Sequence, residues 1–383
     1  MKDLNIFITI MGHPNFRGGG NTAAHNFAET FAKLGYNVTA LFLSPKKFLR
    51  ILPKTSYRLV LLKDSRIPFF NCFRVAIALR KIISFSPTQK NIIISFGYEG
   101  FLVPKKGSVF VAASLAPLLR HISFKELFSD WRYFLPTNLG KWFFLLSCYF
   151  DRLTKLKADF VQCLCESSAE ECHAIYKIPV KRIFTVPLGV DIKKFTLGPR
   201  TKERTILFAG GSAEYKGLDI LLKALPAIIK KHPNARLTVI GEMSPKRTKE
   251  LLNIAEELCV FSNIDWLGLA SQEEMAGFYK KSYVLALPSR AESFLLAAIE
   301  GMSCGIPIVA TPVGIIPEII VHGVNGFIMR PEDPKSLSEV IIKLFDNPQK
   351  AETLGKAGRK TVGDKFAWEK IGKQYAMELK KLI

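Results

Sequence analysis

The sequence is short of acidic residues in its first half and has few histidines. Of 383 residues only six are His, and residues 1–200 carry 12 Asp and Glu against 29 Lys and Arg. Residues 201–383 carry 21 against 25, so the net charge of +21 comes mainly from the first half. The longest uncharged aromatic run, 142–150, is far shorter than the roughly 20 residues that span a bilayer. These shortages predict a basic globular protein that does not cross a membrane.

Paired cysteine motifs are also missing. The seven Cys are scattered, and no two CxxC units occur, so we expect no bound metal. Cys163 and Cys165 alternate at the end of an apolar segment, which suits reduced, partly buried thiols in the cytoplasm. The apolar run at 6–11 is too short for a signal peptide core and is interpreted as a first strand.

Apolar segments alternate with amphipathic ones along the whole chain. The predicted strands of the first half are 5–11, 37–43, 91–96, 108–113, 159–164 and 183–187, with helices between them, for example at 22–34. The second half predicts strands at 205–209, 236–240, 264–267, 283–287 and 306–310, and helices at 217–231, 248–257, 272–280, 294–303 and 335–345. Repeated strand–helix units indicate an α/β fold with parallel sheets covered on both faces.

A cluster of Pro, Gly and charged residues separates the two series and predicts a linker. We therefore expect an N-terminal Rossmann-like domain at 1–190, a linker at 191–204 and a C-terminal Rossmann-like domain at 205–365. Residues 366–383 are predicted to form a helix that packs back toward the N-terminal domain. Two such domains would face each other across a cleft, with ligands bound at the carboxyl ends of the strands.

Three loops follow predicted strands and carry the candidate site residues. The first contains Gly18, Gly19 and Gly20, which let a backbone approach a ligand closely before a helix begins. The second, 208–217, contains Gly210, Gly211 and Lys216, whose ammonium group suits a diphosphate. The third, 288–302, contains Glu292, Phe294, Leu295 and Glu300. The simpler interpretations are an ordinary flexible turn, a surface lysine and two solvated helix carboxylates.

The spacing of these motifs resembles that of the family 4 (group 1) glycosyltransferases, which have the GT-B architecture. From about 208 to 366 the matching motifs are Lys216-Gly217, Pro288-Ser289, Glu292-x7-Glu300, 305–311, 314–319 and 323–327. The first half matches less tightly, through Gly18-Gly19, Ala158-Asp159 with Ser167, and 186–191. The resemblance covers nearly the whole chain.

The resemblance implies a role for each candidate residue. Glu300 would bind the ribose hydroxyls of a nucleotide-sugar donor, and Glu292 would contact the transferred sugar. Lys216 and the amides of Phe294 and Leu295 would hold the diphosphate, with Gly210 and Gly211 beside it and Gly18 to Gly20 approaching from the other domain. Glu292 and Lys216 are the predicted catalytic residues, acting by positioning and by neutralising the leaving diphosphate.

The implied activity is hexosyl transfer that retains anomeric configuration and uses neither a metal nor another cofactor. The absence of an Asp-x-Asp motif agrees with the metal-independent expectation. The expected acceptor is a glycan or lipid-linked molecule of the cell surface. The expected location is the cytoplasm, at the inner face of the membrane.

Three positions depart from the family pattern. Gly211 stands where the family has Arg, for which Arg290 or Arg17 are candidate substitutes. Ser293-Phe294-Leu295 replaces Gly-Phe-Gly, and Ser114 occupies a position that often holds His, with His13 and His121 as the nearby histidines. These departures motivate a second hypothesis, a catalytically degenerate homologue that binds a nucleotide sugar.

Two further hypotheses have less support. A nucleotide-sugar epimerase would need a cleft rich in carboxylates and His. A nucleic-acid binder is suggested only by the charge, and no recognition motif is present. The aromatic and basic segment 131–152 predicts either a peripheral contact with anionic lipid or a buried helix. The basic first half favours the membrane contact.

Overall fold

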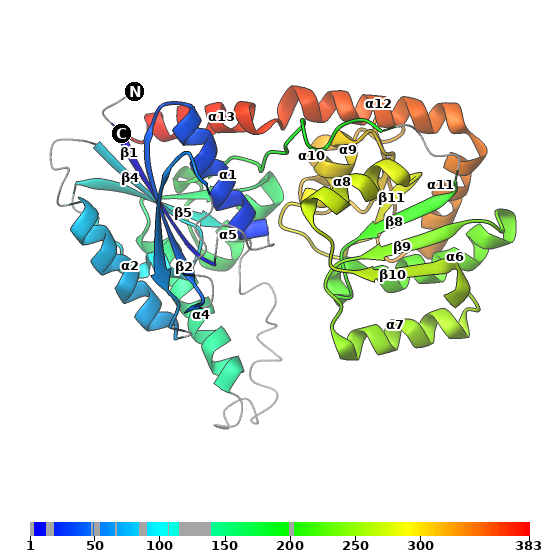
Figure 1. The fold of residues 1–383 in the computed structure, drawn as a ribbon, viewed down its shortest axis with the longest axis horizontal. Helices are drawn as coiled ribbons and strands as arrows, with labels where there is room; N and C mark the ends of the chain where they lie inside the picture. Colours follow the sequence, from blue (N-terminus) through cyan, green and yellow to red (C-terminus); the bar gives the residue numbers. More distant parts are fainter. Residues whose placement is uncertain are drawn as a thin grey trace. The chain divides into compact units, whose positions relative to one another are not determined.

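The computed structural model describes residues 4–12, 19–46, 49, 54–65, 67–83, 90–105, 107–114, 139–198 and 203–383. The chain divides into two compact units (Figure 1). The N-terminal unit combines Met1–Pro187 with Trp368–Ile383, and the C-terminal unit is Leu188–Ala367. Each unit contains one parallel sheet with helices packed on it.

The N-terminal unit is built on a seven-stranded sheet. Its strands are β1 Leu4–Met11, β2 Asn37–Ser44, β3 Arg58–Lys63, β4 Lys90–Ser95, β5 Ser108–Ser114, β6 Phe160–Cys163 and β7 Ile183–Thr185. They lie in the order β3-β2-β1-β4-β5-β6-β7, and all are parallel. The central strands are buried almost throughout, because both faces of the sheet are covered.

Helices cover both faces of this sheet. They are α1 Gly19–Lys33, α2 Pro68–Ile83, α4 Leu139–Lys157, α5 Glu166–Tyr176 and the C-terminal α13 Trp368–Lys381. One face carries α2 and α5, whose apolar side chains share a core cluster with Phe7 and Ile93, and α4, whose Phe150 packs with Cys72 of α2 in a second cluster. The other face is covered by α1 and α13, whose aromatic side chains pack against each other.

The C-terminal unit is built on a six-stranded parallel sheet in the order β10-β9-β8-β11-β12-β13. Its strands are β8 Thr205–Ala209, β9 Arg236–Ile240, β10 Ile264–Gly268, β11 Val284–Leu287, β12 Ile308–Ala310 and β13 Phe327–Ile328. Its helices are α6 Leu218–Lys231, α7 Pro245–Glu257, α8 Gln272–Lys281, α9 Leu296–Ser303, α10 Ile316–Ile319, α11 Pro334–Asp346 and α12 Pro348–Lys365. The strand order brings the loops after β8 and β11 next to each other at the centre of the sheet.

Local sequence explains where several of these helices begin. α7, α11 and α12 each start with Pro, and the preceding Ser244, Asp333 and Asn347 each accept a hydrogen bond from a backbone amide of the first turn. α8 begins with a capping box between Ser271 and Glu274. A side-chain acceptor and Pro at the first helical position satisfy amides that have no partner inside the helix.

The predicted strands are confirmed to within a few residues, while α9 begins at Leu296 and not at residue 294. The sequence analysis gave no ranges for the strands β3 and β13 or for the helices α2, α5, α10 and α12. Of the seven cysteines, all free, six are buried and Cys259 is exposed. None of the helices in the described ranges is sufficiently long and apolar to cross a bilayer.

Candidate functional site

The loops that follow β8 and β11 meet at the carboxyl edge of the C-terminal sheet. Gly217 has a φ of 73°, and a Cβ atom at this position would lie 2.0 Å from the carbonyl oxygen of Pro288. The amide of Arg290 donates a hydrogen bond to the carbonyl of Tyr215 at 2.7 Å. Glycine is therefore required at residue 217, because any side chain would separate the two loops.

The two predicted catalytic side chains contact each other across these loops. The ammonium group of Lys216 lies 2.7 Å from Oε1 of Glu292. The hydroxyl of Ser289 donates to the same carboxylate oxygen at 2.9 Å. The side chain of Glu292 is 8% exposed and that of Lys216 is 21% exposed. A charge-assisted hydrogen bond of this kind holds both groups at one edge of the sheet.

Gly210 and Gly211 pack against the loop after β9. Their amides donate to the carbonyl of Ile240 at 2.9 and 3.0 Å. Gly211 has a φ of 69°, and a Cβ atom there would lie 2.3 Å from the carbonyl oxygen of Glu242. Both amides are therefore already hydrogen-bonded within the C-terminal unit. A side chain at residue 211, such as the Arg of the family pattern, would not fit this backbone.

The loop that contains Gly314 and Ile315 holds the segment before α9 in place. The Phe294 carbonyl accepts a hydrogen bond from Ile315 at 3.0 Å, and a Cβ atom on Gly314 would approach it to 2.8 Å. Leu295 has a left-handed backbone, with a φ of 78° and a ψ of 61°. Within the described ranges, the amides of Phe294 and Leu295 have no hydrogen-bond acceptor. They precede the positive end of the α9 dipole, which favours an anion.

Glu300 lies on α9 and is held by α8. The Tyr279 hydroxyl donates to Oε2 of Glu300 at 3.0 Å. Burial raises the pKa of Glu300 to about 7, although the Tyr279 hydrogen bond and the charge of Lys194 act in the opposite direction. The sequence analysis selected Glu300 as a candidate and did not name Tyr279. The Tyr279 partner depends on packing between two helices, and helical periodicity alone does not reveal it.

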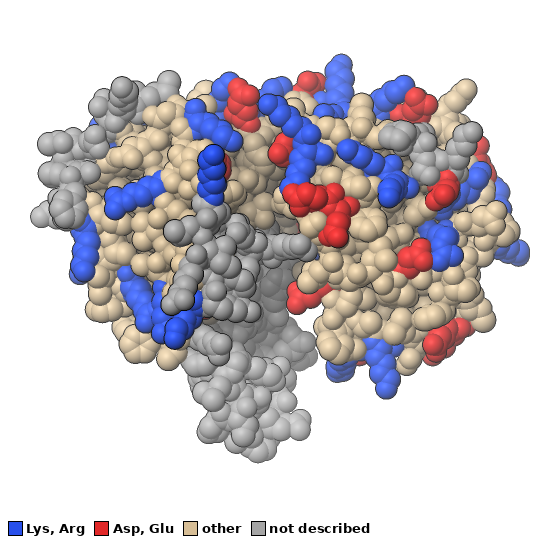
Figure 2. Space-filling model, viewed as in Figure 1, with Lys and Arg blue, Asp and Glu red and all other residues tan. Residues whose placement is uncertain are grey.

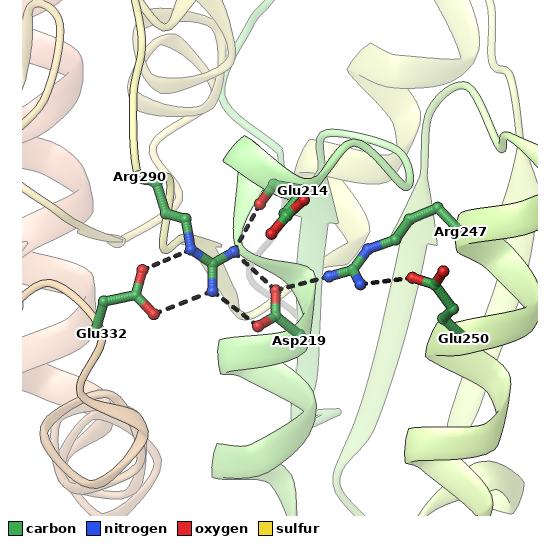
Figure 3. Close-up of polar contacts among 6 residues, drawn as sticks. All are labelled: Glu214, Asp219, Arg247, Glu250, Arg290 and Glu332. Carbon is green, nitrogen blue, oxygen red and sulfur yellow. Dashed lines mark hydrogen bonds and ion pairs between the residues drawn. The ribbon is translucent and has the colours of Figure 1, made fainter. Parts of the chain in front are cut away.

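The guanidinium of Arg290 is paired with a group of carboxylates (Figure 3). Its guanidinium forms two hydrogen bonds with Asp219, at 2.9 and 2.8 Å, and an ion pair with Glu332 at 2.6 Å. Arg247 lies on the other side of Asp219 at 3.3 Å and also pairs with Glu250. Burial acts to raise the pKa of Asp219, but the two guanidinium groups outweigh it and lower that pKa.

This network corrects one expectation of the sequence analysis. Arg290 was a candidate replacement for the missing family Arg, but its guanidinium is paired with Asp219 and Glu332 and does not join Lys216. The sequence analysis missed Asp219, whose position in the first turn of α6 looks like an ordinary helix-start carboxylate.

The remaining candidates lie in the N-terminal unit. Gly19 and Gly20 are the first residues of α1, whereas Gly18, Arg17, His13 and His121 lie outside the described residues. Ser114 ends β5 and is buried. The structure adds Glu99, a buried carboxyl group that accepts hydrogen bonds from Thr9 and Ser95 at the ends of β1 and β4. No three His, Cys, Asp or Glu side chains in the described ranges are grouped as metal ligands.

Comparison with known proteins finds relatives of part of the chain. Residues 190–361 match the family model described as glycosyl transferases group 1. An uncharacterized glycosyltransferase of Methanocaldococcus jannaschii is 37% identical over 164 residues, which are 43% of this chain and 44% of that protein. The chain spans about half the length of the curated relatives it matches.

Solved structures extend the likeness in fold to the whole chain. Sucrose-phosphate synthase of Thermosynechococcus elongatus superposes with a TM-score of 0.79 at 19% identity, over 99% of this chain and 98% of that one. HepE of Anabaena, solved in complex with UDP and glucose, superposes with a TM-score of 0.75 at 18% identity over 98% and 99%. At these identities the likeness is one of fold.

Proposed function

We propose that this chain transfers a hexose from a nucleotide-diphosphate sugar to a glycan or lipid-linked acceptor, because residues 190–361 match the family model of the group 1 glycosyltransferases and the fold resembles that of sucrose-phosphate synthase. The transfer retains anomeric configuration and requires no metal. The single observation that carries this proposal is the Lys216–Glu292 pair at 2.7 Å beside the unbonded amides of Phe294 and Leu295.

Each group in this arrangement has a physical role in the proposed transfer. The ammonium of Lys216 and the amides of Phe294 and Leu295 stabilise the diphosphate as negative charge develops on it. The carboxylate of Glu292, which already accepts two hydrogen bonds, is oriented to accept others from sugar hydroxyls. Because catalysis then depends on positioning and charge, no protein group has to form a covalent bond.

Glu300 is the proposed ribose-binding group. A carboxylate can accept hydrogen bonds from two neighbouring hydroxyls, and one oxygen of Glu300 is already oriented by Tyr279. Because burial raises the pKa of Glu300 to about 7, donor affinity is expected to increase as the pH rises through 7.

A second candidate function is a degenerate homologue that binds the donor without transferring it. The tight packing at Gly211, which leaves no space for the family Arg, favours this alternative. Ser114, in the position that often holds His, favours it as well.

The first test is a thermal-shift screen with UDP- and GDP-sugars, followed by transfer and hydrolysis assays with the best donor. A donor that binds the native state raises the melting temperature. We expect Lys216→Met and Glu292→Gln each to lower kcat by about 100-fold, the effect typical of removing one charge-stabilising group. Lys223→Met, at an exposed position on α6, is the matched control and should retain wild-type activity.

The outcomes separate the candidates. Transfer with a product of unchanged anomeric configuration, in the presence of EDTA, supports the full proposal. Donor binding without turnover supports the degenerate homologue. If none of the nucleotide sugars raises the melting temperature, or if both site variants retain full activity, the proposed site is wrong.

A further inference from the structure

The backbone turn that carries Lys216 is held by a residue from another loop. This turn is the 3-10 helix η7, Glu214–Lys216, which follows β8. Arg290, in the loop after β11, donates to both carbonyl groups that precede Lys216. Its amide bonds to the carbonyl of Tyr215 at 2.7 Å, and its Nη1 bonds to the carbonyl of Glu214 at 2.6 Å. One residue therefore fixes the turn at two successive peptide groups.

These contacts also fix Lys216 relative to Glu292. Arg290 and Glu292 belong to the same loop and are separated by a single residue, so a turn bonded to Arg290 is held beside Glu292 as well. The ammonium of Lys216 lies 2.7 Å from Oε1 of Glu292. In the proposed transfer this ammonium stabilises charge that develops on the diphosphate, and such stabilisation requires donors that are already in place. The proposed catalysis therefore depends on the position of the turn.

The guanidinium of Arg290 is in turn fixed by carboxylates from two other elements (Figure 3). Asp219, in the first turn of α6, accepts from Nη1 and Nη2 at 2.9 and 2.8 Å. Glu332, in the loop after β13, accepts from Nη2 at 3.0 Å and lies 2.6 Å from Nε. Glu332 has a φ of 55°, a left-handed conformation that a residue with a Cβ atom keeps where its surroundings hold it. With the Glu214 carbonyl, three groups share the planar donors of one guanidinium.

Ion pairing alone does not explain this arrangement. The side chains of Asp219 and Arg290 are 9% and 28% exposed, and such pairs contribute little net stability because desolvation offsets their attraction. A lysine at residue 290 would keep the charge, and an apolar side chain would keep the packing. Neither could bond to Asp219, Glu332 and the Glu214 carbonyl together, since both lack the planar fork of a guanidinium. The contacts therefore indicate that Arg290 positions the turn.

Arg247 offers a comparison within the same network. It lies on α7, 3.3 Å from Asp219 and 2.8 Å from Glu250. Its side chain is 23% exposed, close to the value for Arg290. Among the described residues, the hydrogen bonds of the Arg247 guanidinium are to Asp219 and Glu250 alone. The network thus contains one Arg that reaches the turn and one that does not.

From these observations we propose that Asp219 and Arg290 are positioning residues for glycosyl transfer. They hold the turn so that the ammonium of Lys216 meets the diphosphate of the donor. This role rests on the proposed function of the site, and both residues act through Lys216. It involves the C-terminal unit alone and makes no use of the predicted membrane contact through 131–152, of which residues 131–138 lie outside the described residues.

Chemical labelling of lysines tests the positioning without any donor. The full chain is treated with a limiting amount of acetic anhydride, and mass spectrometry gives the rate at Lys216 relative to the exposed Lys223. In Arg290→Met we expect Lys216 to react about 10-fold faster than in wild type, because its hydrogen bond to a carboxylate is weakened. The matched control is Arg247→Met, which also removes an Arg bound to Asp219 and should leave the rate unchanged.

Steady-state kinetics test the consequence for transfer. Arg290→Met should lower kcat by about 30-fold and Asp219→Asn by about 10-fold, because a misplaced charged group stabilises the transition state less. The KM for the donor should stay within about 3-fold, since the ground state carries less of the developing charge. Arg290→Lys keeps the charge without the fork and should remain nearly as slow as Arg290→Met. Arg247→Met should keep the wild-type kcat.

The control is needed because each Arg→Met variant also removes a positive charge. Over the C-terminal unit, the face shown in Figure 2 carries Lys and Arg interspersed with Asp and Glu. Loss of one cation from such a mixed surface changes the overall field little, so a difference between the two Arg→Met variants reports a local contact.

A double-mutant cycle shows whether Arg290 acts through Lys216. In the Lys216→Met background the ammonium is absent, so adding Arg290→Met should lower kcat by less than about 3-fold further. Circular dichroism and thermal unfolding check that each variant folds. Asp219→Asn combined with Arg290→Met removes both charges of the pair and serves where a single variant unfolds.

The outcomes distinguish this proposal from the proposed function. Unchanged labelling of Lys216 in both Arg290→Met and Asp219→Asn overturns the positioning role whatever the activity. Equal kcat values for Arg290→Met and Arg247→Met overturn it as well, and so do fully additive effects in the cycle. Faster labelling in a protein that neither binds nor transfers any sugar supports the positioning of Lys216 and refutes the proposed function instead.

Discussion

Glu99 is an enclosed carboxyl group in the N-terminal unit. It is fully buried, and its Oε1 accepts hydrogen bonds from Thr9 and Ser95 at 3.2 and 3.1 Å. Its Oε2 is buried without a hydrogen-bond partner among the described residues. Burial raises the pKa of Glu99 from 4.5 to about 7, because a charged carboxylate here loses most of its hydration.

The raised pKa of Glu99 makes the folded protein less stable as the pH increases. Between pH 4.5 and 7 the folded protein keeps a proton that the unfolded chain has released, so rising pH reduces the free energy of unfolding. Glu99→Gln removes this penalty and should stabilise the protein at pH 8 by up to about 3 kcal/mol, with little change near pH 4. Urea unfolding at pH 4 and at pH 8 measures this change in the free energy of unfolding. The exposed Glu257→Gln is the control, and equal pH dependence of Glu99→Gln and wild type would contradict the assignment.

At the scale of single residues, the sequence identifies groups better than it identifies their contacts. Motif spacing was sufficient to select Lys216 and Glu292, which the structure brings to 2.7 Å. Tyr279, the partner of Glu300, depends on tertiary packing that spacing does not encode. Leu295 shows a different limit. Its left-handed backbone costs about 1–2 kcal/mol for a residue with a Cβ atom, and burial of its side chain, which is 4% exposed, offsets that strain.

At the scale of elements, a glycine controls the contact between α1 and α13 in the N-terminal unit. A Cβ atom on Gly372 of α13 would lie 2.0 Å from Cγ2 of Thr30 on α1. The fully buried ring of Tyr375 lies next to Phe27 and Phe31 of α1, with centroids 5.0 and 5.4 Å apart. The missing side chain at Gly372 therefore lets the aromatic side chains of the two helices interlock.

We expect Gly372→Ala to lower the free energy of unfolding by about 1–3 kcal/mol, because overpacking forces the two helices apart. Gly363→Ala on α12 is a matched control, since no atom lies within 4 Å of its added methyl group. That control should be neutral or stabilising by up to about 1 kcal/mol, as expected for Ala replacing Gly inside a helix. Thermal unfolding of both variants measures this difference in stability, and equal melting temperatures would refute the packing argument.

Two of the elements that the sequence analysis missed carry different signals. β3 is an edge strand with partly buried residues between two exposed ends, yet its sequence contains an apolar run at 59–62, so the strand signal was present and was overlooked. α2 exposes Phe69, Phe70 and Phe73 on the side opposite its core. Apolar residues on both sides hide the period of 3.6 residues on which helix prediction depends.

At the scale of the whole molecule, the chain contributes to the N-terminal unit twice. It leaves that unit after Pro187, forms the C-terminal unit, and returns at Trp368. The last 16 residues thus belong to a fold that is otherwise completed some 180 residues earlier. The stability of the N-terminal unit should depend on a segment that follows the whole C-terminal unit in the chain.

Deletion of residues 368–383 tests this dependence by hydrogen–deuterium exchange. The deletion removes Trp368 and Tyr375, whose rings contact Phe27 of α1, and each buried aromatic side chain contributes about 1.5–3 kcal/mol. Amides of α1 and β2 should therefore exchange faster, whereas those of β8 and β9, in a separate core cluster, should keep their protection. Deletion of residues 382 and 383 alone is the control. An equal loss of protection in both units would mean that they unfold as one body, and the dependence of one unit on α13 would not hold.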